Sequence, residues 1–261
     1  MSRPVVLTIA GVDPSGGAGI VADIKTIAAL GCFPAAAITS ITFQNTTGVF
    51  GAEHQTAATL RAQVEPIVQD VAVAAAKTGM LPTAEIVAET ARLFAAEKLP
   101  APVVDPVVVA TSGDVLIDEE AFEILKTRLF PLARIVTPNI LEAETLAGFS
   151  IDSEGDMKRA AEAILLLGPG AVLVKGGHRK FNSDALDVLL DRQGIFTEFR
   201  NEYIDAGEIH GSGCTLSAAI ASNLARGATL EDAVRDAKSY VTDLIRRLKS
   251  APRIGHGAAP L

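Results

Sequence analysis

Short apolar runs alternate with amphipathic runs along most of this sequence. Val5–Ala10 is continuously apolar and is ended by Gly11, which is typical of a strand that is buried on both faces. Apolar residues then recur at helical spacing from Ile20 to Ala28, and Gly31 follows as a C-terminal stop. The pattern therefore predicts a strand followed directly by a helix.

The same alternation continues through the chain. Strands are expected at Ala35–Phe43, Val71–Thr78, Val103–Val109, Arg134–Thr137 and Ala171–Lys175. Helices are expected at Thr59–Val68, Ala84–Glu97, Glu119–Leu129, Leu141–Ala147, Met157–Leu167, Cys214–Arg226 and Leu230–Leu248. Two β-like runs, Ala185–Leu190 and Ile195–Arg200, flank a polar turn and predict an antiparallel hairpin.

This order of elements predicts a single three-layer α/β domain over residues 1–261. We expect a mostly parallel central sheet with helices on both faces and an antiparallel edge hairpin. The sequence contains neither an internal repeat nor a long Pro-, Ser- or Gly-rich linker. Ligands of such sheets bind beyond the carboxyl ends of the strands, and the unusual loops of this chain fall at those ends.

Composition narrows the function classes. The formal net charge of −8 leaves no broad basic face, so neither nucleic acid nor an anionic membrane is expected as a partner. No apolar stretch reaches the roughly 18 residues that a membrane span needs. The two cysteines, Cys32 and Cys214, cannot form a disulfide framework, and neither lies in a zinc-type cluster. A reduced, cytoplasmic setting is expected, with Cys32 as a packing residue.

The segment Gly211–Cys214 opens a predicted helix with two glycines. Backbone N–H groups at such a helix start can form a nest for a phosphate. A cysteine in the first turn is expected to have a lowered pKa. Alternatively, the segment is a glycine-rich helix start whose cysteine only fills space. It is not a dinucleotide fingerprint, because Leu216 stands where a small residue is required, and the sequence has no Walker P-loop.

Other candidate residues follow predicted strands. Lys175 precedes a two-glycine turn and could reach an anion, or it could simply be solvated. Asp105 interrupts an apolar run, where a carboxylate is costly unless it is paired or holds a cation. Asn139 and Glu142 fit an ordinary helix cap with an acidic first turn. Gln44 offers an amide that could bind the edge of a heterocycle or form a polar turn.

In order along the chain, these motifs resemble the hydroxymethylpyrimidine/phosphomethylpyrimidine kinases of thiamin biosynthesis, within the ribokinase-like superfamily. The resemblance covers the whole sequence. The motifs that carry it are Ala10–Gly19 with Asp23 and Lys25, Gln44–Thr46, Lys77–Leu81, Val104–Val107 leading to Ser112–Asp114, Thr137–Asn139 with Glu142–Glu144, Lys175–His178, His210–Thr215 and Gly255–Gly257.

The resemblance implies a kinase that uses ATP and Mg²⁺ and acts as a homodimer. Its implied phosphate-binding residues are Gly211, Ser212 and Gly213 as the anion hole, Asn139 beside it, Lys175 on the transferring phosphate, and Asp105 and Glu142 on Mg²⁺ and the triphosphate. The implied pyrimidine-binding residues are Gly11, Asp23, Gln44, Met80 and Val107.

Cys214 stands where most ribokinase-like enzymes have a catalytic Asp, and it is the candidate base for the hydroxymethyl proton. The second phosphorylation has an ionised phosphate as nucleophile, so we expect it to depend less on this residue. Phe43 precedes Gln44 where the family often has a smaller residue, and this difference could alter the pyrimidine pocket. The alternatives are a pyridoxal or pyridoxine kinase of the same superfamily and a non-catalytic nucleotide-binding protein.

Overall fold

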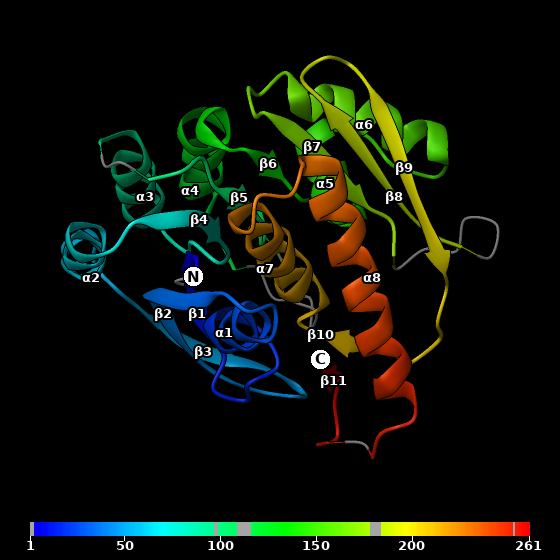
Figure 1. Ribbon diagram of the computed structural model, residues 1–261, viewed down its shortest axis with the longest axis horizontal. Helices are drawn as coiled ribbons and strands as arrows, with labels where there is room; N and C mark the ends of the chain where they lie inside the picture. Colours follow the sequence, from blue (N-terminus) through cyan, green and yellow to red (C-terminus); the bar gives the residue numbers. More distant parts are fainter. Residues whose placement is uncertain (1–2, 97–98, 109–115, 178–183, 253) are drawn as a thin grey trace.

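A computed structural model describes residues 3–96, 99–108, 116–177, 184–252 and 254–261. Within these residues, one sheet of nine strands runs in the order β3-β2-β1-β4-β5-β6-β7-β8-β9 (Figure 1). The strands are β1 (Val5–Val12), β2 (Phe33–Asn45), β3 (Gly48–His54), β4 (Val73–Thr78), β5 (Val103–Val104), β6 (Ile135–Val136), β7 (Ala171–Lys175), β8 (Asp184–Asp191) and β9 (Phe196–Glu202).

The middle of the sheet is parallel, from β2 through β1, β4, β5 and β6 to β7. Both edges are antiparallel: β3 pairs with β2 at one edge, and β8 and β9 continue from β7 at the other. The carboxyl ends of the parallel strands therefore meet along one side of the sheet, where the candidate loops lie.

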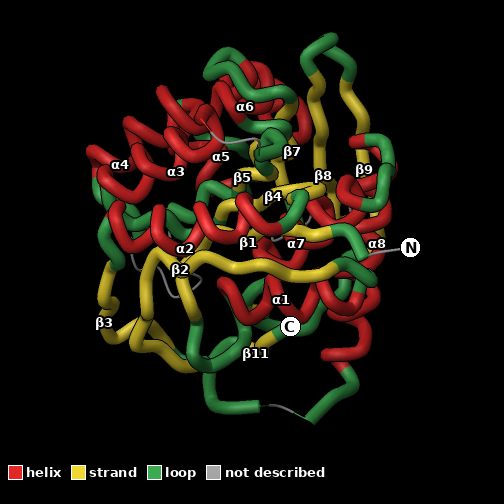
Figure 2. Tube along the Cα trace, turned by 60° about the vertical axis from the view of Figure 1, so that its left-hand side comes forward, coloured by secondary structure: helices red, strands yellow, loops and turns green. Residues whose placement is uncertain are grey.

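Helices cover both faces of this sheet (Figures 1 and 2). One face packs against α2 (Ala57–Asp70), α3 (Ala84–Ala96), α4 (Glu119–Ile124), α5 (Ile140–Ala147) and α6 (Glu154–Leu165). The other packs against α1 (Gly19–Ala29), α7 (Ser212–Ala225) and α8 (Leu230–Lys249). Among the described residues, none of the helices has both the length and the apolar character that crossing a bilayer requires.

The continuous apolar strands follow from this three-layer packing. In β1, Leu7 and Ile9 pack with the α2–α3 layer, whereas Val6, the residue before Leu7, packs with Ile27 of α1. Since successive side chains of a strand point to opposite faces, both sets must be apolar. Cys32 is fully buried in the same layer as Ile27, as a packing residue should be. The predicted three-layer α/β architecture is confirmed.

Three local predictions differ from the structure. The sequence did not indicate β3, because its glycines and charged residues break strand alternation, and β3 is held by pairing with β2. The strand expected at Val103–Val109 pairs only over Val103–Val104, since Pro106 lacks an N–H for the ladder, and Val109 lies outside the described residues. The helix expected to reach Leu129 changes to a π-helical turn at Leu125.

Candidate active site

A cavity of about 710 Å³ opens where the parallel strands end. Its walls include the ends of β1, β2 and β7, the loops that follow β1, β4, β5 and β6, the start of α7 and part of α8. All the sequence-predicted site residues except Asp23 line it: Gly11, Gln44, Met80, Asp105, Val107, Asn139, Glu142, Lys175, Gly211, Ser212, Gly213 and Cys214. The motif residues Ser112–Asp114 and His178 lie outside the described residues.

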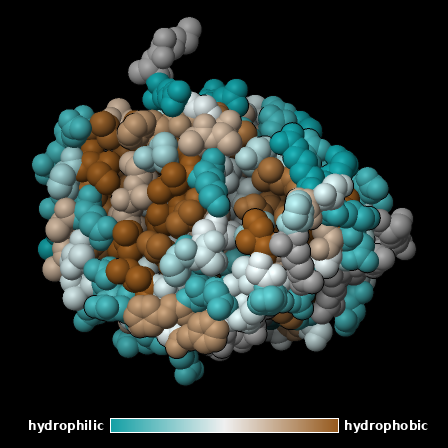
Figure 3. All heavy atoms as spheres, turned by 90° about the horizontal axis from the view of Figure 1, so that it is seen from below, coloured by the Kyte–Doolittle hydropathy of each residue, from teal (hydrophilic) through white to brown (hydrophobic). Residues whose placement is uncertain are grey.

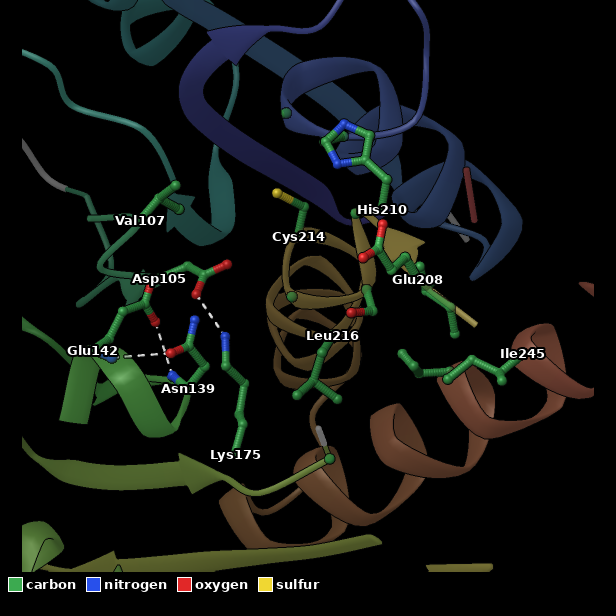
Figure 4. A pocket seen from close by; sticks show the side chains of 18 of the residues that line it. Asp105, Val107, Asn139, Glu142, Lys175, Glu208, His210, Cys214, Leu216 and Ile245 are labelled. Carbon is green, nitrogen blue, oxygen red and sulfur yellow. Dashed lines mark hydrogen bonds and ion pairs between the residues drawn. The ribbon is translucent and has the colours of Figure 1, made fainter. Parts of the chain in front are cut away.

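Lys175 and Asp105 form an ion pair in this cavity, with Nζ 2.9 Å from Oδ1 (Figure 4). The backbone N–H of Lys175 donates to the carbonyl of Pro138, which fixes the end of β7. Burial opposes the charge of Lys175, but the carboxylates of Asp105 and Glu142 outweigh it and raise the pKa of this lysine. The ammonium is therefore protonated at neutral pH, as a phosphate-binding group requires.

Asp105 lies just beyond β5, not inside a strand as the apolar run indicated. Besides Lys175, its carboxylate accepts hydrogen bonds from Ser217 Oγ at 3.2 Å and from Thr137 Oγ1 at 3.3 Å. Burial alone would raise the pKa of Asp105, but the charges of Lys175 and Lys77 hold it below its ordinary value. The carboxylate is paired, which is the condition that its burial requires.

Asn139 and Glu142 form a capping box at the start of α5. The Asn139 side chain accepts from the Glu142 N–H at 2.9 Å, and the Glu142 carboxylate accepts from the Asn139 N–H at 2.8 Å. The ordinary cap is therefore confirmed, and both residues also line the cavity. Burial raises the pKa of Glu142 to about 7, with the charge of Asp105 adding to the rise and Lys175 opposing it.

The start of α7 is built for close approach. Gly211 precedes the helix at φ +85°, in the left-handed region that favours glycine, and because it has no side chain it leaves the first N–H groups of the helix uncapped. A Cβ on Gly211 would lie only 1.8 Å from the carbonyl oxygen of Gly17. A Cβ on Gly213 would lie 3.2 Å from Lys175 Nζ. These glycines therefore bring the first N–H groups of α7, which we call the anion nest (Gly211–Cys214), beside the lysine.

The structure corrects the pKa that the sequence predicted for Cys214. Its position in the first turn of α7 predicted a lowered pKa, but burial raises the pKa of this thiol to about 11. The charge of Lys77 and a hydrogen bond from the Gly19 backbone lower it in part, while Asp23 and Asp105 raise it further. Desolvation and two nearby carboxylates thus outweigh the helix terminus, and the ligand-free protein holds a neutral thiol.

Asp23 does not line the cavity, contrary to its predicted place beside the pyrimidine. It lies on α1, fully buried, where both its oxygens accept from Lys77 Nζ at 2.8–2.9 Å and one accepts from Thr8 Oγ1 at 2.6 Å. Burial opposes the charge of Lys77, but Asp23 raises the pKa of this lysine well above its ordinary value. The Asp23–Lys77 pair is therefore part of the scaffold beneath the cavity.

Gly11, Gln44, Met80 and Val107 line the same cavity. A Cβ on Gly11 would lie 3.0 Å from the Met80 sulfur, so the glycine keeps this wall open. Apolar and amide groups together suit a flat heterocycle, whose face needs apolar contact and whose edge needs hydrogen bonds.

Sequence reasoning missed other residues of this site. Leu216, Val241 and Ile245 form an apolar wall from α7 and α8, and their helical spacing does not distinguish them from core residues. Asp13 and His210 also line the cavity, and their 2.9 Å contact joins segments 197 positions apart. The motifs that carried the family resemblance include both residues, but nothing local showed that they meet.

Comparisons with known proteins agree with this geometry. The sequence profile of the phosphomethylpyrimidine kinase family matches residues 13–261. A hydroxymethylpyrimidine/phosphomethylpyrimidine kinase of Streptomyces coelicolor is 46% identical over 245 residues, which are 94% of this chain and 90% of the relative.

Solved structures of two kinases share the fold of this chain. The phosphomethylpyrimidine kinase of Clostridium difficile 630 superposes with a TM-score of 0.82 at 42% identity, over 93% of this chain and 100% of its own. The ADP complex of Bacillus subtilis pyridoxal kinase superposes with a TM-score of 0.89 at 35% identity, over 99% of this chain and 96% of its own. The fold is thus that of the ribokinase-like kinases, and the chain belongs to the phosphomethylpyrimidine kinase family.

Proposed function

We propose that this protein phosphorylates 4-amino-5-hydroxymethyl-2-methylpyrimidine and then its monophosphate, with ATP as phosphate donor, in thiamin biosynthesis. The observation that carries the proposal is that the paired Lys175 and the anion nest meet in a cavity that Gln44 and Met80 also line. The family profile and the 46% identical kinase of Streptomyces coelicolor support the choice of substrate.

The proposed mechanism is mainly positioning and charge stabilisation. Phosphoryl transfer leaves little covalent chemistry for the protein, so preorganised donors around the transferring group supply most of the effect. Lys175 and the N–H groups of Gly211, Ser212 and Gly213 would stabilise its charge, and Asn139 would line the phosphate site. Gly11, Gln44, Met80 and Val107 would hold the pyrimidine so that its hydroxymethyl oxygen faces the phosphate.

Asp105 and Glu142 fit a divalent cation as a pair of oxygen ligands. Both carboxylates are buried in the cavity wall, and the charge of Asp105 raises the pKa of Glu142. Within the described part of the chain, no cluster of three or more metal-ligating side chains occurs. Mg²⁺ commonly takes one or two carboxylates together with substrate phosphates, so two suffice. When bound, Mg²⁺ would neutralise charge on the triphosphate.

Cys214 remains our candidate base for the first phosphorylation, under a stricter condition than the sequence indicated. A thiol with a pKa of about 11 is protonated at neutral pH and cannot accept a proton. The assignment therefore requires that the loaded site lowers this pKa. Cys214→Ala should slow phosphorylation of the alcohol more than phosphorylation of the monophosphate. Equal loss in both steps with intact binding would contradict the assignment.

A coupled kinase assay tests the function itself. The substrates are hydroxymethylpyrimidine, its monophosphate and pyridoxal, each offered with ATP and Mg²⁺ to the purified protein. We expect turnover of the first two. Turnover of pyridoxal at a much higher kcat/KM would favour the alternative that the pyridoxal kinase likeness supports, and no ATP consumption at all would favour a non-catalytic nucleotide-binding protein.

We also propose that residues 1–261 act as one kinase domain and that two copies form a homodimer in the cytoplasm. The face seen in Figure 3 gathers apolar atoms on the side where β2 and β3 lie in Figure 1. Ile41, Phe43 and Phe50 of these strands are exposed, which is unusual for large apolar side chains near an edge strand. Light scattering after gel filtration would test the dimer, with a monomer mass contradicting it. Cell fractionation would test the compartment.

A further inference from the structure

The carboxylate of Asp13 joins three segments that line the cavity. It accepts hydrogen bonds from the backbone N–H groups of Gly17 and Ala18 at 3.1 and 2.9 Å, in the loop that leads into α1. It also lies 2.9 Å from His210 Nε2, and the side chain of Gln44 helps to lower its pKa. Only 2% of Asp13 is exposed, so these contacts satisfy a carboxylate that water barely reaches.

His210 reaches Asp13 from the residue directly before the anion nest. Burial would raise the pKa of Asp13, but hydrogen bonds from His210, Ser15 and Gln44 hold it below its ordinary value. Because an ionised carboxylate can only accept, the Nε2 of His210 donates the proton of this contact. The histidine thus fastens Gly211 and the start of α7 to the Asp13 loop.

The two segments also touch through their backbones. A Cβ on Gly17 would lie 2.7 Å from the imidazole Cδ2 of His210, and a Cβ on Gly211 would overlap the Gly17 carbonyl. Because the two segments pack this closely, there is no free space between the loop after β1 and the anion nest. A small displacement of His210 would therefore move one segment relative to the other.

The C-terminal segment, residues 258–261, forms hydrogen bonds next to the Asp13–His210 contact. It forms β11 (Ala259–Pro260), which pairs with β10 (Ile209–His210), and the N–H of Leu261 donates to the carbonyl of His210 at 3.2 Å. The N–H of Ala258 donates to the carbonyl of Thr46 at 2.8 Å, two residues after Gln44. The C-terminal segment therefore contacts both β10, which carries His210, and the turn after Gln44.

We infer that Asp13 and His210 are a positioning pair. The pair fixes the residues that we propose to hold the pyrimidine, such as Gln44, relative to the anion nest. The inference rests on the proposed function and deepens it. Gln44 holds the acceptor and the anion nest holds the phosphate, and Asp13–His210 is the bonded link between them. An acceptor misplaced by about 1 Å can cost roughly a hundredfold in rate, so loss of the link should act on kcat more than on binding.

His210→Leu and His210→Gln test the pair, because the glutamine amide can still donate to Asp13 and leucine cannot. For His210→Leu we expect kcat for pyrimidine phosphorylation to fall at least tenfold. KM for each substrate should stay within about threefold, and hydrolysis of ATP by water should not fall in parallel. His210→Gln should recover most of the transfer rate, and both variants should melt close to the unchanged protein.

Three outcomes would overturn the inference: full kcat in His210→Leu, equal loss in both variants, or a loss that follows thermal stability. If His210→Leu does not fold, Asp13→Asn decides in the same assays, since the neutral amide weakens the contact while filling the same volume. Failure of the proposed function looks different, because then the unchanged protein itself would not phosphorylate the pyrimidine.

Discussion

Two of the buried Asp–Lys pairs among the described residues lie close to the carboxyl ends of the parallel strands, and they have different surroundings. The sealed pair, Asp23–Lys77, has no exposed side-chain area on either partner. The cavity pair, Asp105–Lys175, is almost as short at 2.9 Å, but 12% of the Lys175 side chain is exposed toward the cavity. Both pairs join a lysine to an aspartate, but only the cavity pair is accessible to a ligand.

The comparison shows why residue type alone cannot assign a role. A sealed ion pair offers nothing to a ligand, and its removal acts on folding. A pair at a cavity wall keeps donor capacity for a bound phosphate, so its removal should act on catalysis. Both pairs affect the pKa of Cys214, because Lys77 lowers it while Asp23 and Asp105 raise it.

The largest expected effect comes from breaking the sealed pair. Lys77→Met leaves the Asp23 carboxylate buried without its cation and should cost about 3–5 kcal/mol of unfolding free energy in urea titrations. The double variant Lys77→Met/Asp23→Asn should recover much of this loss, because no uncompensated charge remains. A single variant that loses less than about 1 kcal/mol would mean that the pair is not a structural requirement.

Breaking the cavity pair should affect activity instead. Lys175→Met should lower kcat by roughly a hundred- to a thousandfold, because the charge that stabilises the transferring phosphate is lost. Its stability should change less than that of Lys77→Met, since Asp105 keeps Ser217 and Thr137 as donors. Steady-state kinetics measure the loss, with Lys249→Met on the exposed end of α8 as the control. Retained activity would remove Lys175 from the mechanism.

The raised pKa of Glu142 makes the stability of the cavity region depend on pH. The Glu142 pKa of about 7 lies above the ordinary value of 4.5, so the folded protein binds a proton more tightly than the unfolded chain between these values. The stability of the ligand-free protein should therefore fall as pH rises from about 4.5 to 7, and the cost is fully present above that range.

Glu142→Gln should remove this cost, because glutamine keeps the cap without the charge. We expect it to stabilise the ligand-free protein by about 3 kcal/mol at pH 8 and by little at pH 4.5, measured by urea unfolding. Glu162→Gln, at an exposed position of α6, is the control. An equal effect at both pH values would show that the Glu142 charge is not responsible.

The smallest expected effect is on the rate at which the Cys214 thiol is alkylated. At pH 8 iodoacetamide should alkylate Cys214 more than tenfold slower than a free cysteine, because a thiol with a pKa of about 11 is almost wholly protonated. Mass spectrometry of a Cys32→Ala background measures the rate without interference from the second cysteine. Alkylation as fast as that of the free thiol would contradict the raised pKa.

Local patterns predicted the parts of the fold that depend on neighbours in sequence. The continuous apolar run at Val5–Ala10, the β8–β9 hairpin and the glycine-rich start of α7 all appear where the sequence indicated them. The strand β3 did not, since long-range pairing with β2 decides its structure.

The same limit applies to the site. Lys175 and the anion nest could be found because each lies at the end of a regular element. The role of Asp23 could not, because its partner Lys77 is 54 positions away and only the packed fold seals the pair. The pKa of Cys214 was misjudged for a similar reason, since burial by distant segments outweighs the local helix terminus.

The most direct test of this account is a crystal structure with hydroxymethylpyrimidine, Mg²⁺ and a non-hydrolysable ATP analogue bound. We predict that the terminal phosphate lies within hydrogen-bond distance of Lys175 Nζ and of the Gly211–Gly213 amides, while Asp23 still pairs with Lys77 and does not touch the pyrimidine. A direct Asp23–pyrimidine hydrogen bond, or a terminal phosphate bound away from Lys175, would contradict the division between the sealed pair and the cavity pair.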